Sequence, residues 1–260
     1  MLTTRGNHWL RYYLLVWGEQ LNPSFSHLNE YLKTGENAFK LANGDLIWDF
    51  YGKELKQNEI FVEFMSGVTT QAYIPSIVQE LHIGESQTLL DVGGGKGSLV
   101  CSLLARHSHL KGFVYDQPSN SGKASLNIES FDLLDRCSFI GGNMFSNVPA
   151  GYDLYTIKHV LHDWDDQNAV QILNSISDAM RFDSKLIIIE GLMDREFSAE
   201  FKNPEFLHTR NIEQKVWTIG KVRNSRDFEK LCSSAKLKIS KITHSSILDM
   251  SYITCIKTRQ

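Results

Sequence analysis

The order of hydrophobic patterns beyond residue 84 limits the folds that this chain can adopt. Short apolar runs rich in β-branched residues alternate there with stretches whose apolar residues recur at helical spacing. We expect strands at 88–92, 112–116, 137–140, 153–157 and 185–190. We expect helices between them, over 98–107, 120–134 and 167–180. Strands that alternate with helices favour β-α-β units, so the sequence predicts an α/β protein with a parallel sheet.

The residues before this alternation have helical periodicity and little strand character. One apolar stripe at spacings of three and four consists of Phe61, Phe64, Met65, Val68 and Ala72. Pro75 is expected to kink or end that helix. Further core candidates in this part are Trp9, Tyr13, Trp17, Trp48 and Phe50. A helix over 225–235 and strands near 236–242 and 250–257 complete the expected elements. No long linker separates the two parts, so they are expected to pack as one body.

Composition and charge exclude several classes of protein. The chain carries 27 Lys+Arg against 30 Asp+Glu, a net charge of -3, with no basic block, so binding to nucleic acid or to an anionic membrane surface is not expected. The four cysteines are widely scattered, which argues against a disulfide framework or a structural zinc. The apolar stretch 12–17 is too short to span a membrane and lacks the features of a secretory signal. We therefore expect a soluble, cytoplasmic protein.

The strongest local motif is LLDVGGGKGSL, a strand that runs into four glycines and then a helix. Ligands sit at this edge of a parallel sheet, and glycine lets the backbone approach them closely. A dinucleotide fingerprint would need glycine where Ser98 stands. Asp91, two residues before Gly93, would repel a pyrophosphate but would suit an ammonium group. The loop therefore favours S-adenosylmethionine over a dinucleotide.

Asp116 ends the second predicted strand, 25 residues after Asp91. An acid at this place can accept hydrogen bonds from both ribose hydroxyls, in sites for NAD and for S-adenosylmethionine alike. It therefore indicates a nucleoside without choosing one. A glycine cluster can also be only a tight turn, and an aspartate at a strand end can simply cap a helix.

Five motifs in order, DVGGGKG, YDQP, GGNMF, LHDWDD and IIIEG, carry a resemblance to a known family. The chain resembles, over nearly its whole length, the S-adenosylmethionine-dependent O-methyltransferases of the plant caffeate and acetylserotonin type, which include bacterial members. The resemblance implies a Rossmann-like class I methyltransferase sheet with an N-terminal helical segment, and S-adenosyl-L-methionine as cofactor. The cofactor-binding residues that it implies are Asp91, Gly93, Gly95, Asp116, Asn143, Met144 and Lys158. Asn143 stands where the family usually has an aspartate that accepts from the adenine amino group, and its amide oxygen can still accept.

The catalytic residues can be argued from chemistry as well as from the resemblance. Methyl transfer to a phenol requires alignment and removal of a proton, and a phenol has a pKa of roughly 10. A histidine is the natural base near neutral pH. His162 matches the family's base, Glu190 matches the partner that orients its ring, and Asp163 matches a family position beside it. Asp165 and Asp166 are expected to cap the following helix.

The chain departs from the family pattern at two places. Family members often carry a second glutamate in a G-K-E-R-T stretch, where this chain has Val222. The family normally begins with a winged-helix dimerisation domain, whereas this chain begins at the connecting helices. We therefore expect a helical connecting and substrate-lid segment over 1–83 and an S-adenosylmethionine-binding catalytic domain over 84–260. A homodimer would be weakened by the missing domain. No acidic cluster indicates a metal ion.

Four functions remain open at this point. The leading hypothesis is an O-methyltransferase acting on a phenolic or hydroxylated aromatic small molecule, with Met65 among the residues that line the acceptor pocket. The second is a cofactor-binding relative that catalyses hydroxylation or cyclisation. The third is a catalytically weakened protein that still binds the nucleoside, which Val222 and the missing domain suggest. The fourth, a nicotinamide oxidoreductase, is disfavoured by Asp91 and the broken glycine spacing.

Overall fold

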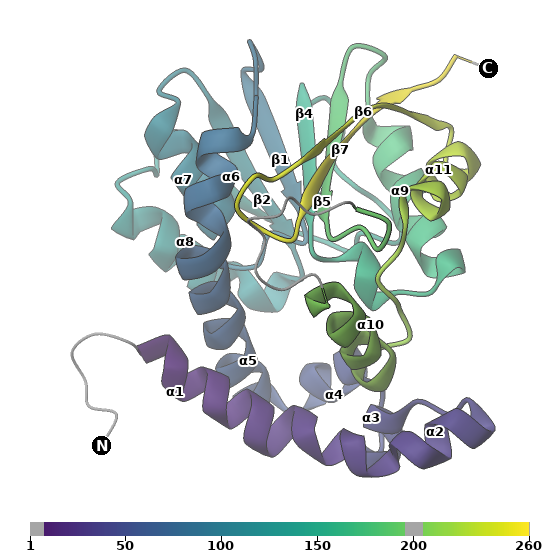
Figure 1. Ribbon diagram of the computed structural model, residues 1–260. Helices are drawn as coiled ribbons and strands as arrows, with labels where there is room; N and C mark the ends of the chain where they lie inside the picture. The colour runs from purple at the N-terminus through teal and green to yellow at the C-terminus, as the bar shows by residue number, and fades with distance from the viewer. Residues whose placement is uncertain (1–7, 196–204, 260) are drawn as a thin grey trace.

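The computed structural model describes residues 8–195 and 205–259, without the side chains of His8, Trp9 and Phe206. Its centre is a seven-stranded sheet of order β3-β2-β1-β4-β5-β7-β6 (Figure 1). The strands are β1 Thr88–Val92, β2 Lys111–Asp116, β3 Cys137–Gly141, β4 Leu154–Lys158, β5 Lys185–Glu190, β6 Leu237–His244 and β7 Ser251–Lys257. The first five are parallel, while β7 runs antiparallel to both β5 and β6. The predicted α/β class and each predicted strand are confirmed.

Helices cover both faces of this sheet. The helices are α1 His8–Leu15, α2 Leu28–Thr34, α3 Ala38–Asn43, α4 Ile47–Lys53, α5 Leu55–Val68, α6 Ile74–Glu80, α7 Ser98–Arg106, α8 Ser121–Ser130, α9 Asp166–Ala179, α10 Phe206–Trp217 and α11 Ser225–Ser234. Residues of α6, α7 and α8 share one hydrophobic cluster with the sheet, and residues of α9 and α11 share another. Successive strand residues alternate between the clusters, as the two-residue period of a strand requires: Leu89 joins the first and Leu90 the second.

The strand order reverses between β1 and β4, which lie side by side although the chain visits β2 and β3 between them. The loops that follow β1 and β4 therefore leave the sheet in opposite directions at the same carboxyl edge. That is the usual place for a ligand site in an open α/β sheet. The glycine loop follows β1, and the segment containing His162 follows β4, so both predicted halves of the site meet at this edge.

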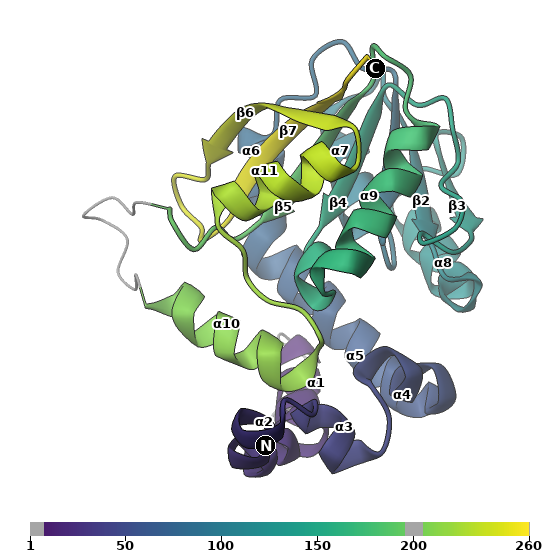
Figure 2. The ribbon, with the colours of Figure 1, turned by 90° about the vertical axis from the view of Figure 1, so that its right-hand side faces the viewer.

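Helices α1 to α5 lie across this carboxyl edge, with α10 beside them (Figures 1 and 2). Their core consists of Val16, Leu21, Ala38, Phe39, Ile47, Tyr51 and Phe64, together with Val216 and Trp217 of α10. Helix α10 was not predicted, because its sequence FLHTRNIEQKVW is mostly polar and its apolar side packs on helices of the first 83 residues. Nζ of Lys96 in the glycine loop contacts Oε1 of Glu63 in α5 at 3.0 Å, which ties the helices to the sheet edge. The predicted packing into one body is confirmed.

The long helix before the sheet changes character in the middle. Between α5 and α6 lies a π-helical turn, Thr69–Tyr73, and Pro75 occupies the first turn of α6. The expected break near Pro75 is therefore present. A π-helical turn inserts extra residues per turn, which moves the buried face by one position. Tyr73 is buried while Ala72 is exposed, so the prediction that Ala72 belongs to the apolar stripe is wrong.

The predicted core candidates of the helical part surround its core rather than form it. Trp17, Trp48 and Phe50 are half-buried and pack against the core cluster. Tyr13 is 37% exposed, so its placement in the core was wrong. Its ring contacts Trp17 and the buried Phe64 of α5 at centroid distances of 5.9 and 5.8 Å, at the border of the core. The side chain of Trp9 lies outside the described residues.

Two smaller predictions concern the cysteines and membranes. All four cysteines are free and buried, in accord with the absence of a disulfide framework, although Sγ of Cys232 and Sγ of Cys255 lie 3.6 Å apart. Sequence spacing could not reveal this pair, because the two residues come from α11 and β7. Within the described residues, no helix has the length and apolar character needed to cross a membrane.

Candidate active site

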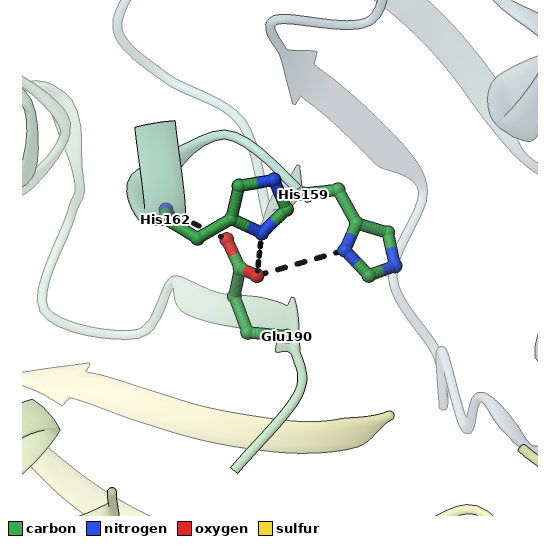
Figure 3. A group of neighbouring side chains, drawn as sticks. All are labelled: His159, His162 and Glu190. Atoms are coloured by element: carbon green, nitrogen blue, oxygen red, sulfur yellow. Dashed lines mark hydrogen bonds and ion pairs between the residues drawn. The ribbon is translucent and has the colours of Figure 1, made fainter. Parts of the chain in front are cut away.

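The residues predicted to be catalytic meet where β4 and β5 end. His162 lies in a single 3-10 turn, Leu161–Asp163, directly after β4, and Glu190 is the last residue of β5. Nδ1 of His162 lies 2.7 Å from Oε2 of Glu190 (Figure 3). Both side chains are buried. The structure therefore brings His162 and Glu190 into direct contact, as the sequence predicts.

Glu190 is oriented by backbone as well as by the imidazole. Its Oε1 accepts hydrogen bonds from the backbone N–H groups of Val160 and His162, at 3.2 and 3.3 Å. Its Oε2 is then left for the ring of His162. Because an ionised carboxylate has only acceptors, Nδ1 of His162 must donate, and Nε2 keeps the lone pair that a general base needs.

The surrounding charges set the protonation states of the two acids. Burial alone would raise the pKa of Glu190, but the charge of His162 and the nearby rings of His162 and His159 outweigh it and hold that pKa well below its usual value. Burial raises the pKa of Asp163 to about 6, an effect that the charge of His162 opposes. Oδ1 of Asp163 lies 3.5 Å from Nε2 of His162, so the structure places Asp163 beside the free nitrogen of the predicted base.

A second histidine, which the sequence did not single out, completes the cluster. Nδ1 of His159 lies 3.6 Å from Oε2 of Glu190 (Figure 3). The same nitrogen lies 3.2 Å from Nη2 of Arg210. His159 has a positive φ of 51°, although it is not a glycine. Arg210 also contacts Tyr73 Oη at 2.8 Å and Asp249 Oδ2 at 3.3 Å. Five separate segments supply these residues, and no motif connects them in sequence.

The segment that carries His162 is clamped from behind by residues 218–223. The fully buried Arg223 donates from Nη1 to the carbonyl of Leu161 and from Nη2 to that of Trp164, both at 2.7 Å, and also pairs with Asp166. Gly220 lies so close that a Cβ at this position would be 1.9 Å from the carbonyl oxygen of His162. These contacts hold the turn in place, and sequence reasoning missed both residues.

The structure also shows the contacts of Asp165 and Asp166, which follow the base, and of Val222, which stands where the family often has a second glutamate. Asp165 caps α9 by accepting from the backbone N–H of Asn168, as predicted. Asp166 is the first residue of that helix, and its carboxylate pairs with Lys221 and Arg223, so the prediction that it caps the helix was wrong. Val222 is buried, and its side chain lies next to Gly191, directly after Glu190. The field of a second carboxylate is therefore missing at that point.

The glycine loop is a tight turn between β1 and α7. Gly93 and Gly97 have positive φ angles of 73° and 78°, and a Cβ on either would lie 2.7 Å from a valine side chain. Asp91 lies beneath this turn, buried, and its Oδ1 accepts from Thr156 Oγ1 at 2.6 Å. Burial raises the pKa of Asp91 to about 6, although Thr156 and the nearby Lys158 oppose the shift. The backbone at these positions leaves no room for other side chains.

Lys158 lies at the end of β4, near Asp91. Burial lowers its pKa to about 8, and the charge of Asp91 opposes that shift. Its Nζ contacts Oγ1 of Thr69, in the π-helical turn, at 3.3 Å. The structure thus brings Asp91 and Lys158 together across β1 and β4, and connects both to the helical part of the chain.

Asp116 closes the other side of the glycine loop. Its Oδ2 accepts from the backbone N–H of Gly95 at 2.8 Å, and its Oδ1 accepts from Gln117 and from Asn120 Nδ2. A carboxylate has about four lone-pair sites, and three are used here. Without a movement of Asn120, one ribose hydroxyl fits rather than the two that the sequence suggested. Asp116 therefore orders the loop as well as facing its ligand edge.

The residues predicted to contact adenine lie beyond Asp116, after β3. Gly142 donates its N–H to the carbonyl of Asp116, which places the following Asn143 next to the loop. Oδ1 of Asn143 accepts from the backbone N–H of Phe145 at 3.0 Å and retains one acceptor site. Met144 is partly buried against the sheet core. The residue after them, Phe145, packs edge-on against Trp164 of the segment after β4, with ring centroids 4.7 Å apart.

A small pocket opens between the two parts of the molecule, next to the predicted base. Trp48 and Ile47 line it from α4, and Asp163 and Trp164 line it from the segment after β4. The rings of Trp48 and Trp164 are nearly parallel, with centroids 6.4 Å apart. Met65, which the sequence suggested for an acceptor pocket, packs partly buried against the helical core instead.

The cluster of Figure 3 contains residue types that also bind metals. Ligand atoms of His159, His162 and Glu190 all lie within 4.8 Å of one another. The guanidinium of Arg210, 3.2 Å from Nδ1 of His159, already places a fixed positive charge beside them, which disfavours a metal cation. The expectation that no metal is used stays a prediction.

Comparison with known proteins identifies the family. The sequence profile of the O-methyltransferase domain matches residues 25–238. The chain belongs to the O-methyltransferase family. The expected family is therefore confirmed, and S-adenosyl-L-methionine is the cofactor of that family.

Named relatives of this O-methyltransferase chain include bacterial enzymes of natural-product synthesis. Mitomycin biosynthesis 6-O-methyltransferase of Streptomyces lavendulae is 35% identical over 177 residues, 68% of this chain and 50% of that protein. Phenazine O-methyltransferase of Lysobacter antibioticus is 26% identical over 228 residues, 88% of this chain and 65% of that protein. The chain thus spans about half to two thirds of the length of these relatives.

A solved structure shows the same fold. An O-methyltransferase from neocarzinostatin biosynthesis, crystallised with S-adenosyl-L-homocysteine and 1,4-dihydroxy-2-naphthoic acid, superposes with a TM-score of 0.84 at 25% identity. The match covers 95% of this chain and 73% of that one. The predicted Rossmann-like class I methyltransferase fold with an N-terminal helical segment is thereby confirmed.

Proposed function

We propose that this chain transfers a methyl group from S-adenosyl-L-methionine to a hydroxyl of an aromatic small molecule, with His162 as the general base. The observation that carries the proposal is the buried 2.7 Å contact between His162 Nδ1 and Glu190 Oε2 at the carboxyl edge that also holds the glycine loop. The names of the relatives support an aromatic natural product as acceptor.

The residues at the glycine loop fit the proposed cofactor. A positively charged, phosphate-free ligand suits an edge with the carboxylates of Asp91 and Asp116 and tight glycine backbone between them. Asp116 would accept a hydrogen bond from the ribose, and Gly93 and Gly95 would let the backbone approach the methionine portion. The positive charge of Lys158 would favour the ionised form of Asp91. Asn143 and Met144 would contact the adenine. When bound, S-adenosylmethionine supplies a methyl group on a positively charged sulfur.

The base has a defined task in this reaction. Nε2 of His162 takes the proton from the acceptor hydroxyl while the oxygen forms its bond to the methyl carbon and the carbon–sulfur bond breaks. Glu190 stabilises the imidazolium that results, because its carboxylate already receives the Nδ1 hydrogen. Asp163, beside Nε2, would orient the ring or the acceptor hydroxyl.

The test separates binding from turnover. His162→Ala should lower methyl transfer to a panel of phenolic acceptors by about 100-fold or more, the scale expected when a general base is lost. Calorimetry with S-adenosylhomocysteine should show unchanged binding, because no predicted cofactor contact involves His162. His109→Ala is the matched control, an exposed histidine after α7 at the opposite edge of the sheet, and should leave activity unchanged.

Two outcomes would contradict the proposal. Binding of NAD in preference to S-adenosylhomocysteine would point to a dehydrogenase. Full methyl transfer by His162→Ala would restrict this chain's contribution to alignment and exclude His162 as the base. The division into a lid segment over 1–83 and a catalytic domain over 84–260 belongs to the same proposal, and a homodimer would need surface from the helical part.

A further inference from the structure

We propose that Arg210 is a positioning residue: by donating a hydrogen bond to Nδ1 of His159, it holds that ring in the tautomer that leaves Glu190 to His162 alone. The inference rests on the proposed function, because it concerns how His162 is supported as a base. It goes further by giving a task to two residues, Arg210 and His159, that neither the family motifs nor the glycine loop include.

The argument begins with competition for one oxygen. Oε1 of Glu190 is occupied by two backbone N–H groups, so Oε2 is the oxygen that faces the rings. Nδ1 of His162 is 2.7 Å from it and Nδ1 of His159 is 3.6 Å from it. If both rings carried hydrogen on Nδ1, both would donate to the same atom. The base would then share the carboxylate that receives its Nδ1 hydrogen, in a chain where Val222 stands in place of a second glutamate.

Arg210 decides which ring donates. A guanidinium has hydrogen-bond donors and no acceptor, so the 3.2 Å contact between Nη2 of Arg210 and Nδ1 of His159 requires a lone pair on that nitrogen. A hydrogen on Nδ1 would place two donors face to face. His159 therefore carries its hydrogen on Nε2, and its Nδ1 has no hydrogen to donate to Glu190.

The conformation and surroundings of His159 are energetically unfavourable in two respects. Charged and titratable groups approach it from every packed element: Arg210 from α10, Glu190 from β5, Lys158 from β4, Tyr73 from the π-helical turn, and His162 with ring centroids 5.3 Å apart. Its backbone adopts φ 51°, which is unfavourable for a histidine, and its buried Nε2 has no partner among the described residues. Both features cost free energy, and the contact with Arg210 offsets part of it.

Arg210 is itself fixed from two other directions. Tyr73 Oη accepts from Nη1 at 2.8 Å, and Asp249 Oδ2 lies 3.3 Å from the same nitrogen. Tyr73 belongs to the helical part and Asp249 precedes β7, so the guanidinium connects the helices, the last strands and the base. The position of the guanidinium is therefore set by segments that are distant in sequence from the turn that carries His162.

Spectroscopy tests the tautomer directly. In nitrogen NMR spectra of histidine-labelled wild-type protein, the signal of His159 is the one that vanishes in His159→Asn. This signal should be that of a neutral ring with its hydrogen on Nε2. Asparagine is a suitable replacement because it tolerates positive φ. In Arg210→Met, the same ring should move to the Nδ1 tautomer or become charged. A wild-type His159 with hydrogen on Nδ1, or a ring unaffected by Arg210→Met, would overturn the proposal.

Kinetics distinguish this role from a structural one. Arg210→Met should lower kcat about tenfold, with KM for S-adenosylmethionine within about twofold. His159→Asn alone should change kcat less than threefold. The double variant should recover most of the lost kcat, because the competing ring is gone, whereas general damage would persist or add. A double variant as slow as Arg210→Met would contradict the proposal. If the wild type methylates no acceptor, the proposed function fails, while the ring spectra still test the tautomer.

Discussion

The two halves of the proposed site lie at one sheet edge but are built in different ways. On the cofactor side, Gly95 and Asp116 are 21 residues apart and belong to consecutive strand ends. On the side of the base, the decisive contacts join residues 28, 51 and 62 apart: His162 with Glu190, His159 with Arg210, and Leu161 with Arg223. The contact that orders the glycine loop is therefore local, although Asp91 and Lys158 on the same side contact Thr156 and Thr69, 65 and 89 residues away. The base is positioned by distant segments that the complete fold brings together.

This difference has consequences for how each half responds to change. A substitution in the glycine loop acts on the loop itself and on what it binds. A substitution in residues 205–223 acts on His162 through backbone contacts and through Arg210. Within this range, Thr218 and Ile219 also line the small pocket beside Asp163. The base should therefore be more sensitive than the glycine loop to changes in the packing of residues 205–223.

The largest effect is expected at Gly220, on the side of the base. A Cβ there would meet the carbonyl oxygen of His162 at 1.9 Å and the backbone of Trp164 at 2.6 Å, so Gly220→Ala must displace the turn that carries the base. We expect a loss of about 3 kcal/mol or more in the free energy of unfolding, since backbone atoms cannot rotate out of the way as a side chain can. Urea denaturation measures it.

A matched control is Gly122→Ala in α8, where nothing lies within 4 Å of the added Cβ. This variant should be as stable as the wild type or gain up to about 1 kcal/mol, since alanine favours a helix. Equal stability of the two alanine variants would show that residues 218–223 do not clamp the base, and the contrast between the two halves would be lost.

The same contrast explains what the sequence revealed. The strands, the glycine loop, Asp116 and the cap at Asp165 were predicted because each depends on periodicity or on neighbours a few residues away. His162 and Glu190 were found only because the family resemblance connects them. Arg210, His159 and Arg223 were missed: the chemistry of each depends on partners from other segments. Ala72 was misplaced because a π-helical turn leaves no periodic signal of its own.

Asp116 gives the next largest effect, on the cofactor side. Asp116→Ala removes the acceptor for Gly95 and for the ribose, so affinity for S-adenosylhomocysteine should fall about tenfold or more, measured by calorimetry. The melting temperature of this variant should change little, because the contacts around His162 stay intact. Asn120→Ala is the control, because it frees Oδ1 for a second ribose hydroxyl and should leave affinity equal or higher. Unchanged binding by Asp116→Ala would exclude this acid as the ribose partner.

The smallest effect concerns the free energy of folding at Asp91. Burial raises the pKa of this carboxyl to about 6, from 3.8 in its ordinary state. A folded-state pKa above the unfolded one means that folding favours the protonated form, so this group destabilises the protein increasingly as pH rises from about 4 to about 6. Asp91→Asn, which keeps an oxygen for Thr156, should remove that penalty.

The shift from 3.8 to about 6 corresponds to about 3 kcal/mol at pH 7.5. We expect Asp91→Asn to recover about 1 kcal/mol of it, because the amide loses the charged hydrogen bond from Thr156, and we expect the difference to disappear below pH 4. The same variant should bind S-adenosylhomocysteine more weakly, because the charge that faces the ammonium group is gone. Denaturation at several pH values, together with calorimetry, measures both. A variant less stable at pH 7.5 would show that the pair with Lys158 outweighs the burial of Asp91, and the charge on this side would then support the fold as well as the ligand.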